Sequence, residues 1–466
     1  MTAALLLARA GHQVQLFERE EGLGGLWASR LDEAGHFRGD NSCKVYQSSY
    51  HTAPALFELI GTDWRAHFTG RHDLTTDWLR PFVADCTWRD LRILAAACLK
   101  HRAGLGLFHR LPVTVFMEEQ RLSEPCKAWL RATALGGIAG TLRMTTWELF
   151  HRLGSNIREI FRGSDGPLYW NAQPPNTSGG FIAPWWTCLA HHGVTVHTGT
   201  SIVSVASHED GVILERESGE KHNADAVFLA IPPPALSALL CASPDPIAEG
   251  FGLSRTQLSA FLRESVYEHV GMAWFFDTQL PCELPLGGHN VRRGWHPILV
   301  QHQQYQPSLR APALSVVVGS VAIDTTFRHH RLGTLASEYG PEALANLLWE
   351  DERLVDPTLP EPIDIEILGL SSATQVVHRG PLPVKMAQAP VFLATNVHGQ
   401  APYFTASLEA AIQAGAIAAQ HFEPDVEQLP MGTARGPLPW SAVDRSREES
   451  SQMSAASVRT ASDATP

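Results

Sequence analysis

A carboxylate and a pair of glycines near the start of the chain could together bind the sugar and phosphates of a dinucleotide. Glu18 ends an alternating segment, residues 13–17, and Gly24 and Gly25 follow shortly after it. A carboxylate at a strand end can accept hydrogen bonds from a ribose. Glycines allow the backbone to approach a phosphate closely. The spacing indicates a nucleotide-binding turn, and for Glu18 taken alone the alternative is a solvated charge at a strand end.

The elements around these residues form half of a β-α-β unit. Residues 2–10 are rich in Ala and Leu and predict a buried helix, which Gly11 ends. Residues 13–17 alternate and predict a strand. In a dinucleotide-binding fold the pyrophosphate lies at the N-terminus of such a helix, and the acidic residue lies at the end of the strand. Glu18 is placed for that role.

Two later segments contain further strands and helices of this kind. Residues 177–232 predict a Gly-Gly turn, a helix up to His192, a strand at residues 193–197 and a closing strand that ends in Pro232. Residues 389–396 predict a buried strand, and residues 403–415 predict a helix of small residues packed closely behind it.

Taken together, the segments at residues 2–27, 177–232 and 389–420 resemble, in order and spacing, the flavin-containing amine oxidase and carotenoid (phytoene) desaturase superfamily. The resemblance implies an α/β fold in which a Rossmann-like FAD-binding domain is interleaved with a mixed α+β substrate domain. The FAD-binding domain would comprise residues 1–75, 177–235 and 385–422, and the substrate domain, with a helical insertion, residues 76–176 and 236–384. Composition predicts a mostly disordered tail at residues 423–466.

The resemblance also implies which residues contact FAD. Ile202 would meet the adenine through its backbone, and Asn396 stands where an acidic residue is usual, although an amide can still hydrogen-bond a hydroxyl. The last helix would point its N-terminus at the flavin ring, where its dipole favours the anionic reduced flavin. The full predicted set is Glu18, Arg19, Gly24, Gly25, Leu26, Trp27, Ile202, Asn396, Tyr403, Ser407 and Leu408.

The N-terminal region departs from the family pattern. Members carry a first strand and a Gly-x-Gly-x-x-Gly turn, but here Thr2 begins where that turn would have just ended, and Gly22 and Leu26 replace the arginines that flank the Gly pair. Two interpretations follow. Either the assigned start codon lies about a dozen or more residues too late, or the product is a fragment whose FAD binding is weakened by the missing phosphate donors.

We expect a non-covalent FAD oxidoreductase that moves a hydride from a C–N or C–C bond of a small organic or apolar substrate to the flavin. The missing Lys in residues 270–277 favours a desaturase or isomerase, whereas Tyr403 and Phe404 favour an amine oxidase, so the donor bond stays open. The alternative is a truncated relative with weak or no FAD binding and no activity. The sequence identifies no catalytic acid or base: Lys44, Tyr46 and His51 would face the ring only along the family's path, and a structural role is the alternative for each.

Composition restricts the remaining function classes. The 466 residues are 44% hydrophobic and 18% charged, which supports one or more sizeable cores. A formal charge of -12 without a Lys/Arg cluster argues against a nucleic-acid partner, so a small molecule is the expected one. Seven scattered cysteines predict reduced thiols, and the histidine spacings predict no metal site. No uncharged apolar stretch reaches about 18 residues, so we expect no transmembrane helix and a cytoplasmic location.

Overall fold

The structure, a computed structural model, describes most of residues 1–431. The residues in this range that it does not describe are 41–44, 48–49, 74–78, 103–110, 135–143, 147, 151–167, 173–177, 210, 245–248, 265, 282–283, 285–293, 303–306, 324–326, 375–381 and 403–406. Residues 432–466 also lie outside the described part.

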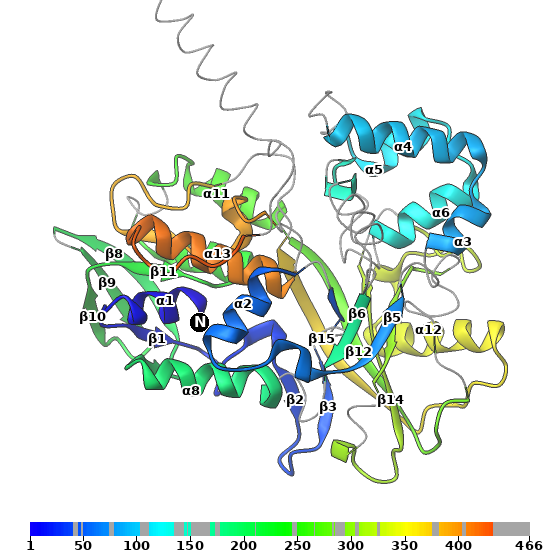
Figure 1. Ribbon diagram of the computed structural model, residues 1–466, viewed down its shortest axis with the longest axis horizontal. Coiled ribbons are helices and arrows are strands. Elements are labelled where there is room, and N and C mark those ends of the chain that lie inside the picture. Colours follow the sequence, from blue (N-terminus) through cyan, green and yellow to red (C-terminus); the bar gives the residue numbers. More distant parts are fainter. Residues whose placement is uncertain are drawn as a thin grey trace, which may run out of the picture.

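Two pairs of parallel strands bring the three sequence segments together. Strand β1 (Gln15–Phe17) pairs with β7 (Thr195–His197), and β11 (Val227–Leu229) pairs with β16 (Val391–Leu393). Each of these strands carries apolar side chains that are at least half-buried, and helices cover both pairs. The helices beside them are α1 (Thr2–Arg9), α2 (Thr52–Leu59), α8 (Ala183–His191) and α13 (Leu408–Phe422), as Figure 1 shows.

Helix α1 packs closely against α13. Leu5 and Leu6 of α1 are fully buried in the cluster that also contains Ile412 and Ala416 of α13. A Cβ added at Gly415 would lie 2.9 Å from the Cβ of Thr2, closer than Cβ atoms approach in proteins. Glycine at this position therefore allows the last helix to pack directly on the first.

A four-stranded antiparallel sheet forms the centre of the other half. Its order is β13 (Ile298–Gln301), β14 (Ser315–Ala322), β12 (Val266–Phe276) and β15 (Asp364–Thr374). Because side chains alternate along a strand, Trp274 and Phe276 of β12 pack with Trp349 of α12 (Pro341–Val355) on one face. Phe275 lies on the other face, with Phe37 of β3 (Phe37–Asp40). Figure 1 shows α12 on one side of this sheet and the parallel strand pairs beyond the other side.

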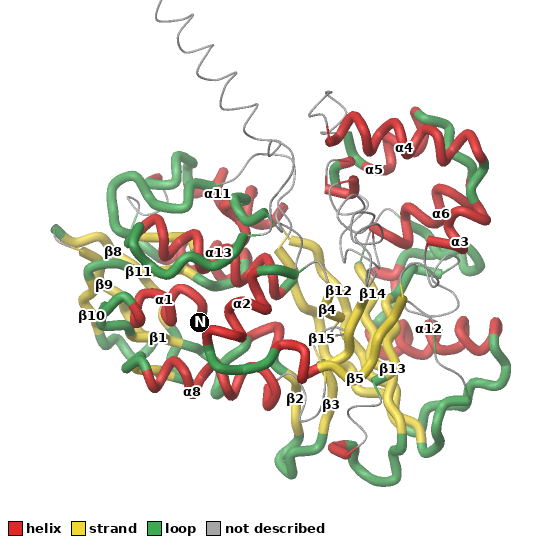
Figure 2. The backbone as a smooth tube through the Cα atoms, viewed as in Figure 1, coloured by secondary structure: helices red, strands yellow, loops and turns green. Residues whose placement is uncertain are grey.

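Smaller sheets and helices complete the described chain, and Figure 2 shows their distribution. Strand β2 (Ser29–Leu31) pairs with β3, and a three-stranded sheet contains β4 (Val45–Gln47), β6 (Leu168–Ala172) and β5 (Phe68–Asp73). A second three-stranded sheet packs against two helices; its strands are β8 (Ile202–His208), β9 (Gly211–Arg216) and β10 (Lys221–Ala224), and the helices are α9 (Pro233–Ala242) and α11 (Arg255–Glu264).

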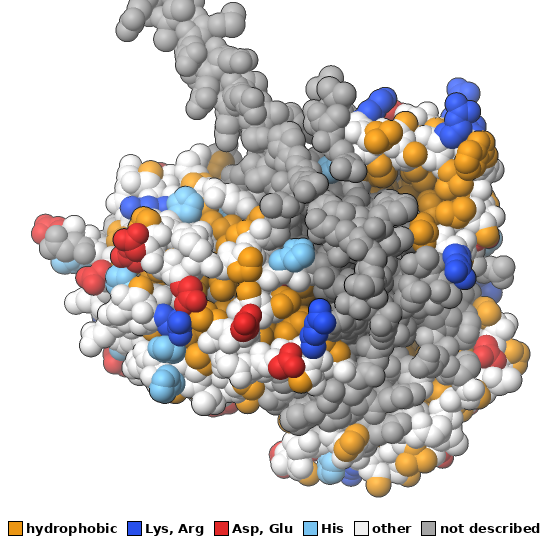
Figure 3. All heavy atoms as spheres, viewed as in Figure 1, with side chains coloured by type: hydrophobic (Ala, Val, Ile, Leu, Met, Phe, Trp, Pro, Cys, Tyr) orange, Lys and Arg blue, Asp and Glu red, His pale blue; other side chains and the backbone are white. Residues whose placement is uncertain are grey.

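A group of four helices has its own hydrophobic core. It comprises α3 (Arg80–Asp85), α4 (Trp88–Arg102), α5 (Val113–Glu119) and α6 (Glu124–Ala132). Figure 3 shows apolar side chains gathered on the surface of this group, where Trp88 and Leu99 are 76% and 66% exposed. Within the part of the chain that the structure describes, no helix combines the length and the apolar character needed to cross a membrane.

The sequence-based prediction placed the start of the disordered tail, at residue 423, too early. Residues 423–431 pack on the domain: Val426 and Leu429 are buried in the same cluster as α1 and α13, and the carbonyl oxygen of Pro430 accepts a 2.8 Å hydrogen bond from Thr52 Oγ1. The prediction was wrong here because it relied on polar and Pro-rich composition, whereas two apolar side chains are sufficient to anchor a short segment.

Candidate cofactor-binding site

The C-terminal end of β1 positions Glu18 beside the segment that leads into β8. Glu18 N donates to the carbonyl oxygen of His197 over 2.9 Å, and the carbonyl oxygen of Glu18 accepts a 2.8 Å hydrogen bond from Thr200 N. Ile202, the first residue of β8, follows two positions later. The Glu18 side chain is half-buried, and its Oε1 accepts a 3.0 Å hydrogen bond from Glu20 N. The fold therefore brings two residues of the predicted set, Glu18 and Ile202, to one edge.

The start of α1 lies at this same edge. Burial lowers the pKa of the Met1 amino group, just before α1, to about 6, and the negative charge of Glu18 opposes this shift, so the amino group lies within electrostatic range of the Glu18 carboxylate. A helix N-terminus beside a strand-end carboxylate is the arrangement that binds a pyrophosphate and its ribose in dinucleotide-binding folds.

The two glycines after Glu18 have different structural roles. Gly24 has a φ of +114°, and a Cβ there would lie 2.2 Å from Cδ1 of Ile182. Gly24 is thus required for packing against the start of α8. Gly25 has a φ of +53°, and no atom lies within 4 Å of the position of an added Cβ. The open space over Gly25 fits the approach of a phosphate, so the residues present are compatible with FAD.

The side chains next to the glycine pair differ in accessibility. Leu26 is 43% exposed beside the open space. Arg19 extends into solvent and forms a 2.7 Å ion pair with Glu20, so the structure places it on the surface and not over the turn. Trp27 is held by neighbouring aromatic residues: its Nε1 donates to Tyr46 Oη over 2.8 Å, and its ring lies 5.1 Å from that of Phe181.

The third segment supplies the start of α13. Asn396 follows β16 in the short helix η9 (Asn396–His398) and is buried. Ser407 caps α13, since its Oγ accepts a 3.1 Å hydrogen bond from Ala410 N, and Leu408 packs against the cluster that contains α1. Burial lowers the pKa of His398, at the end of η9, to about 4, so this imidazole is neutral at pH 7. Tyr403, the remaining member of the predicted set, lies outside the described residues.

Glu409 is a buried carboxylate that the sequence reasoning missed. Its oxygens accept backbone hydrogen bonds from His51 over 3.0 Å, and from Thr52 and Ala53 over 2.8 Å each. These are the unpaired N–H groups at the start of α2, so a residue of α13 caps another helix. The only local signal was an acidic residue in the first helical turn.

The three candidates for a catalytic acid or base are placed as follows. The structure places Tyr46 in the core, where it accepts the Trp27 hydrogen bond, and His51 at the exposed start of α2. Lys44 lies outside the described residues.

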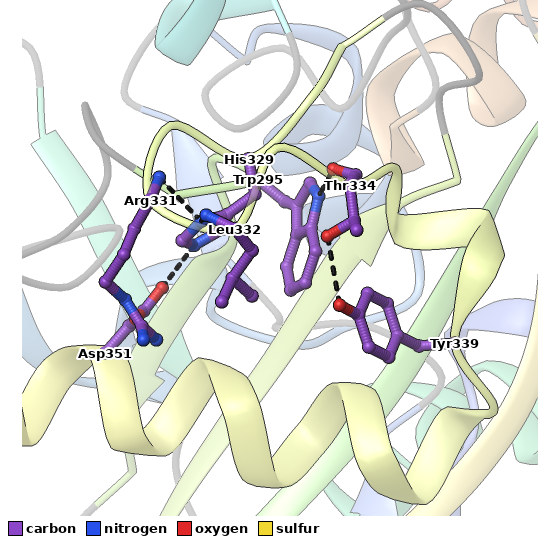
Figure 4. Close-up of polar contacts among 7 residues, drawn as sticks. All are labelled: Trp295, His329, Arg331, Leu332, Thr334, Tyr339 and Asp351. Atoms are coloured by element: carbon purple, nitrogen blue, oxygen red, sulfur yellow. Dashed lines mark hydrogen bonds and ion pairs between the residues drawn. The ribbon is translucent and has the colours of Figure 1, made fainter.

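A second buried polar cluster lies far from this edge, between the loop before residue 336 and α12 (Figure 4). His329 Nε2 contacts Asp351, and His329 Nδ1 accepts backbone hydrogen bonds from Arg331 and Leu332, each over 3.1 Å. Burial would raise the pKa of Asp351, but hydrogen bonds from His329 and Arg331 lower it below its usual value. All of these groups are paired with one another, so the cluster fixes the loop on α12. No three His, Cys, Asp or Glu side chains in the described ranges are grouped for a metal ion.

The model of the flavin containing amine oxidoreductase family matches residues 1–78 and 119–260 of the chain. No curated protein matches this chain. Solved structures with the same fold include a putative protoporphyrinogen oxidase from Exiguobacterium sp. 255-15, with 15% identity, coverage of 91% of this chain and 96% of that one, and a TM-score of 0.58. A fatty acid isomerase from P. acnes that produces CLA has 13% identity, coverage of 90% and 96%, and a TM-score of 0.58. Putrescine oxidase bound to putrescine has 12% identity, coverage of 90% and 96%, and a TM-score of 0.56.

These identities show a shared fold and not a shared substrate. The α/β fold class predicted from the sequence is confirmed, as is the resemblance to the flavin-containing amine oxidases. The family match also confirms FAD as the cofactor.

Proposed function

We propose that this FAD-dependent oxidoreductase of the flavin-containing amine oxidase superfamily moves a hydride from a C–N or C–C bond of a small organic or apolar substrate to a non-covalently bound flavin. The observation that carries the proposal is the meeting of Glu18, Thr200 and the start of α1 at the end of β1. That edge combines a carboxylate for a ribose with a helix N-terminus for phosphates.

Residues from all three segments would hold the cofactor. Glu18 would accept hydrogen bonds from the adenosine ribose, and the backbone at Gly25 would lie against the pyrophosphate. Ser407 and Leu408 would place the start of α13 towards the flavin, with the buried amide of Asn396 beside the hydroxyl groups of its chain. The bound flavin supplies the hydride acceptor, and the protein supplies orientation and an environment without water.

The substrate would meet the four-stranded sheet on the face away from α12. Ala273, Phe275, Val316 and Val318 are buried together on this face, packed with Phe37 and Leu309. The apolar character of this face supports an apolar or small organic substrate next to it. We therefore assign residues 1–75, 177–235 and 385–422 to cofactor binding, and residues 76–176 and 236–384 to the substrate side.

The proposal includes both a C–N and a C–C bond as the hydride donor. Strand β12 carries no Lys, which favours oxidation of a C–C bond over oxidation of an amine. Tyr403 and Phe404, the residues that support amine oxidation, lie outside the described residues. The substrate panel described below separates the two chemistries.

One observation supports a second candidate function, that of a relative with weak or no FAD binding and no activity. Among the described strands, the pair β1–β7 and the pair β11–β16 belong to separate sheets, with no strand hydrogen-bonded to both pairs. A divided sheet provides a less rigid support for a cofactor that spans it.

Absorbance spectroscopy of the purified protein separates the two candidates. The enzyme is expected to show the flavin spectrum, either as purified or after incubation with FAD. Anaerobic mixing with primary amines in one series, and with long-chain unsaturated acids in another, should bleach the flavin in only one series. A protein that stays colourless after reconstitution with FAD supports the second candidate, and a coloured protein that no donor bleaches contradicts hydride transfer from either bond.

A further inference from the structure

Two cysteines from different helices face each other inside the group of four helices. Cys86 ends α3, and Cys126 lies in the first turn of α6. Both side chains belong to the same hydrophobic cluster; Cys126 is fully buried and Cys86 is 9% exposed. The two thiols lie close enough to interact, and a side-chain hydrogen bond between them is the largest influence on the pKa of each.

Polar contacts on both sides of Cys86 in the chain hold the two cysteines near each other. Before Cys86 in the chain, Asp85 Oδ2 accepts a 2.9 Å hydrogen bond from Trp129 Nε1. After it, Asp90 Oδ2 accepts hydrogen bonds of 2.6 Å from both Thr87 Oγ1 and Ser123 Oγ. The neighbours of one cysteine are thus tied to the neighbours of the other. These contacts hold the C-terminal end of α3 beside the start of α6, where the two cysteines lie.

We propose that Cys86 and Cys126 are a modification site, at which a small peroxide converts the two thiols into a disulfide that links α3 to α6. In the first step the Cys86 sulfur attacks one oxygen of hydrogen peroxide; the O–O bond breaks, and a sulfenic acid and water form. In the second step the Cys126 sulfur attacks the Cys86 sulfur, the S–O bond breaks, and a second water leaves with the proton of Cys126. Two thiols and one hydrogen peroxide thus give one disulfide and two waters.

The environment of the pair assigns the order of these steps. The hydrogen bond from Cys126 lowers the pKa of the Cys86 thiol, against the opposing effects of burial and of Asp90. The same hydrogen bond, together with burial, raises the pKa of Cys126. Since the thiolate is the nucleophile, Cys86 reacts first and Cys126 resolves the product. The 9% exposure of Cys86 favours a small oxidant over bulky disulfides.

The chain offers a matched control in the same region. Cys98 of α4 packs against the same cluster, and burial raises the pKa of its thiol to about 11. Burial alone raises its pKa, with no contribution from Cys86 or Cys126, so it should stay reduced under conditions that oxidise Cys86. The proposal does not depend on the proposed function, because the oxidant is added from outside and no turnover is needed.

Peptide mapping of the full-length protein tests the proposal without any mutation. The reduced protein is treated with hydrogen peroxide, remaining thiols are alkylated, and peptides are identified by mass spectrometry. A Cys86–Cys126 linked peptide should appear, and it should disappear after reduction. If both cysteines are recovered alkylated, or oxidised only to sulfinic acid, the pair does not form a disulfide and the proposal is overturned.

Variants then test the order of the steps. In C126S the sulfenic acid at Cys86 should persist and be trapped by dimedone, whereas in C86S Cys126 should remain a thiol. C98S should behave as the wild type. A result in which dimedone traps Cys126 in C86S as fully as it traps Cys86 in C126S would contradict the assignment of Cys86 as the nucleophile of the first step. Far-UV circular dichroism shows whether each variant is folded. Where a variant is not folded, the peptide mapping of the wild type still decides whether the disulfide forms.

Discussion

The carboxylate of Glu409 accepts the backbone N–H of Thr52 over 2.8 Å, so that the first turn of α13 caps the first turn of α2. The partners are more than three hundred residues apart in the sequence, and Glu409 is almost completely buried. Two helix N-termini meet at one negative charge, which offsets the partial positive charge of both helix dipoles. This contact holds α2 beside the helix that we assign to the flavin.

Replacement of Glu409 should therefore destabilise the protein. E409A leaves the N–H groups of residues 51–53 without acceptors inside the core, and we expect a loss of about 3 kcal/mol in the free energy of unfolding. E409Q should lose less, because its amide oxygen still accepts hydrogen bonds. Denaturant unfolding measures both changes. E427A removes an exposed carboxylate paired with Arg9 and should have little effect; equal losses for E409A and E427A would refute the capping role.

Glu18 should control the affinity for FAD with little effect on stability. Its carboxylate is half-buried at the strand end, and replacement by Gln removes a charged acceptor for the ribose. We expect E18Q to weaken FAD binding by about 10- to 100-fold, as for the loss of a hydrogen bond to a charged group. Titration of the apoprotein with FAD, followed by flavin fluorescence, gives the dissociation constant. E20Q alters an exposed residue that pairs with Arg19 and serves as the control; the assignment fails if both variants bind FAD equally well.

The two adjacent glycines should respond differently to an added methyl group. G24A places a Cβ 2.2 Å from Ile182 Cδ1 at a φ of +114°, so it should reduce the free energy of unfolding by about 2 kcal/mol or more. Shortening Ile182 in a double variant should restore part of this loss. G25A meets open space and should reduce stability by only about 1 kcal/mol, the cost of its left-handed backbone.

The variants G24A and G25A also distinguish a packing role from a role in cofactor binding. G25A should lower the affinity for FAD by about tenfold or more, because its methyl group would occupy the space assigned to a phosphate. Unfolding and FAD titration of both variants provide the comparison. An unchanged FAD affinity in G25A would show that the open space over this residue is not part of the cofactor site.

Glu148 should make stability depend on pH. Burial raises the pKa of this carboxyl from 4.5 to about 7, although Thr145 N and Oγ1 donate hydrogen bonds to it. When the pKa of a group is higher in the folded protein than in the unfolded chain, the group contributes stability at pH values below its unfolded pKa. This contribution is lost as the pH rises through the folded pKa, here about 7. The free energy of unfolding should fall by up to about 3 kcal/mol between pH 4.5 and pH 8 through this group.

The variant E148Q isolates that contribution. Its amide stays neutral and can still accept from Thr145, so the pH dependence should become flatter over this range while the stability at low pH changes little. Denaturant unfolding at several pH values measures the difference from the wild type. E119Q, which changes an exposed residue of α5, should keep the wild-type profile. A steep profile that persists in E148Q would locate the titrating group elsewhere.

Much of the local structure followed from apolar spacing. Residues 2–10, 13–17 and 193–197 were predicted as helix, strand and strand, and the structure contains α1, β1 and β7 at these places. The position of Glu18 at a strand end and a helix within residues 403–415 were also predicted, because strand ends and small-residue helices leave a local pattern. The observed helix α13 begins later, at Leu408, and runs to Phe422. The predicted binding roles of these residues remain predictions.

The type and approximate place of the elements in the three segments could be predicted from the sequence, because burial repeats with the period of each helix or strand. Four contacts became visible only in the folded structure: Glu409 caps α2, residues 423–431 pack on the domain, Gly24 accommodates Ile182 and Cys86 lies against Cys126. Each of these depends on a partner far away in the chain. Periodicity specifies a buried face, but the path of the whole backbone selects the side chain that fills the space opposite it.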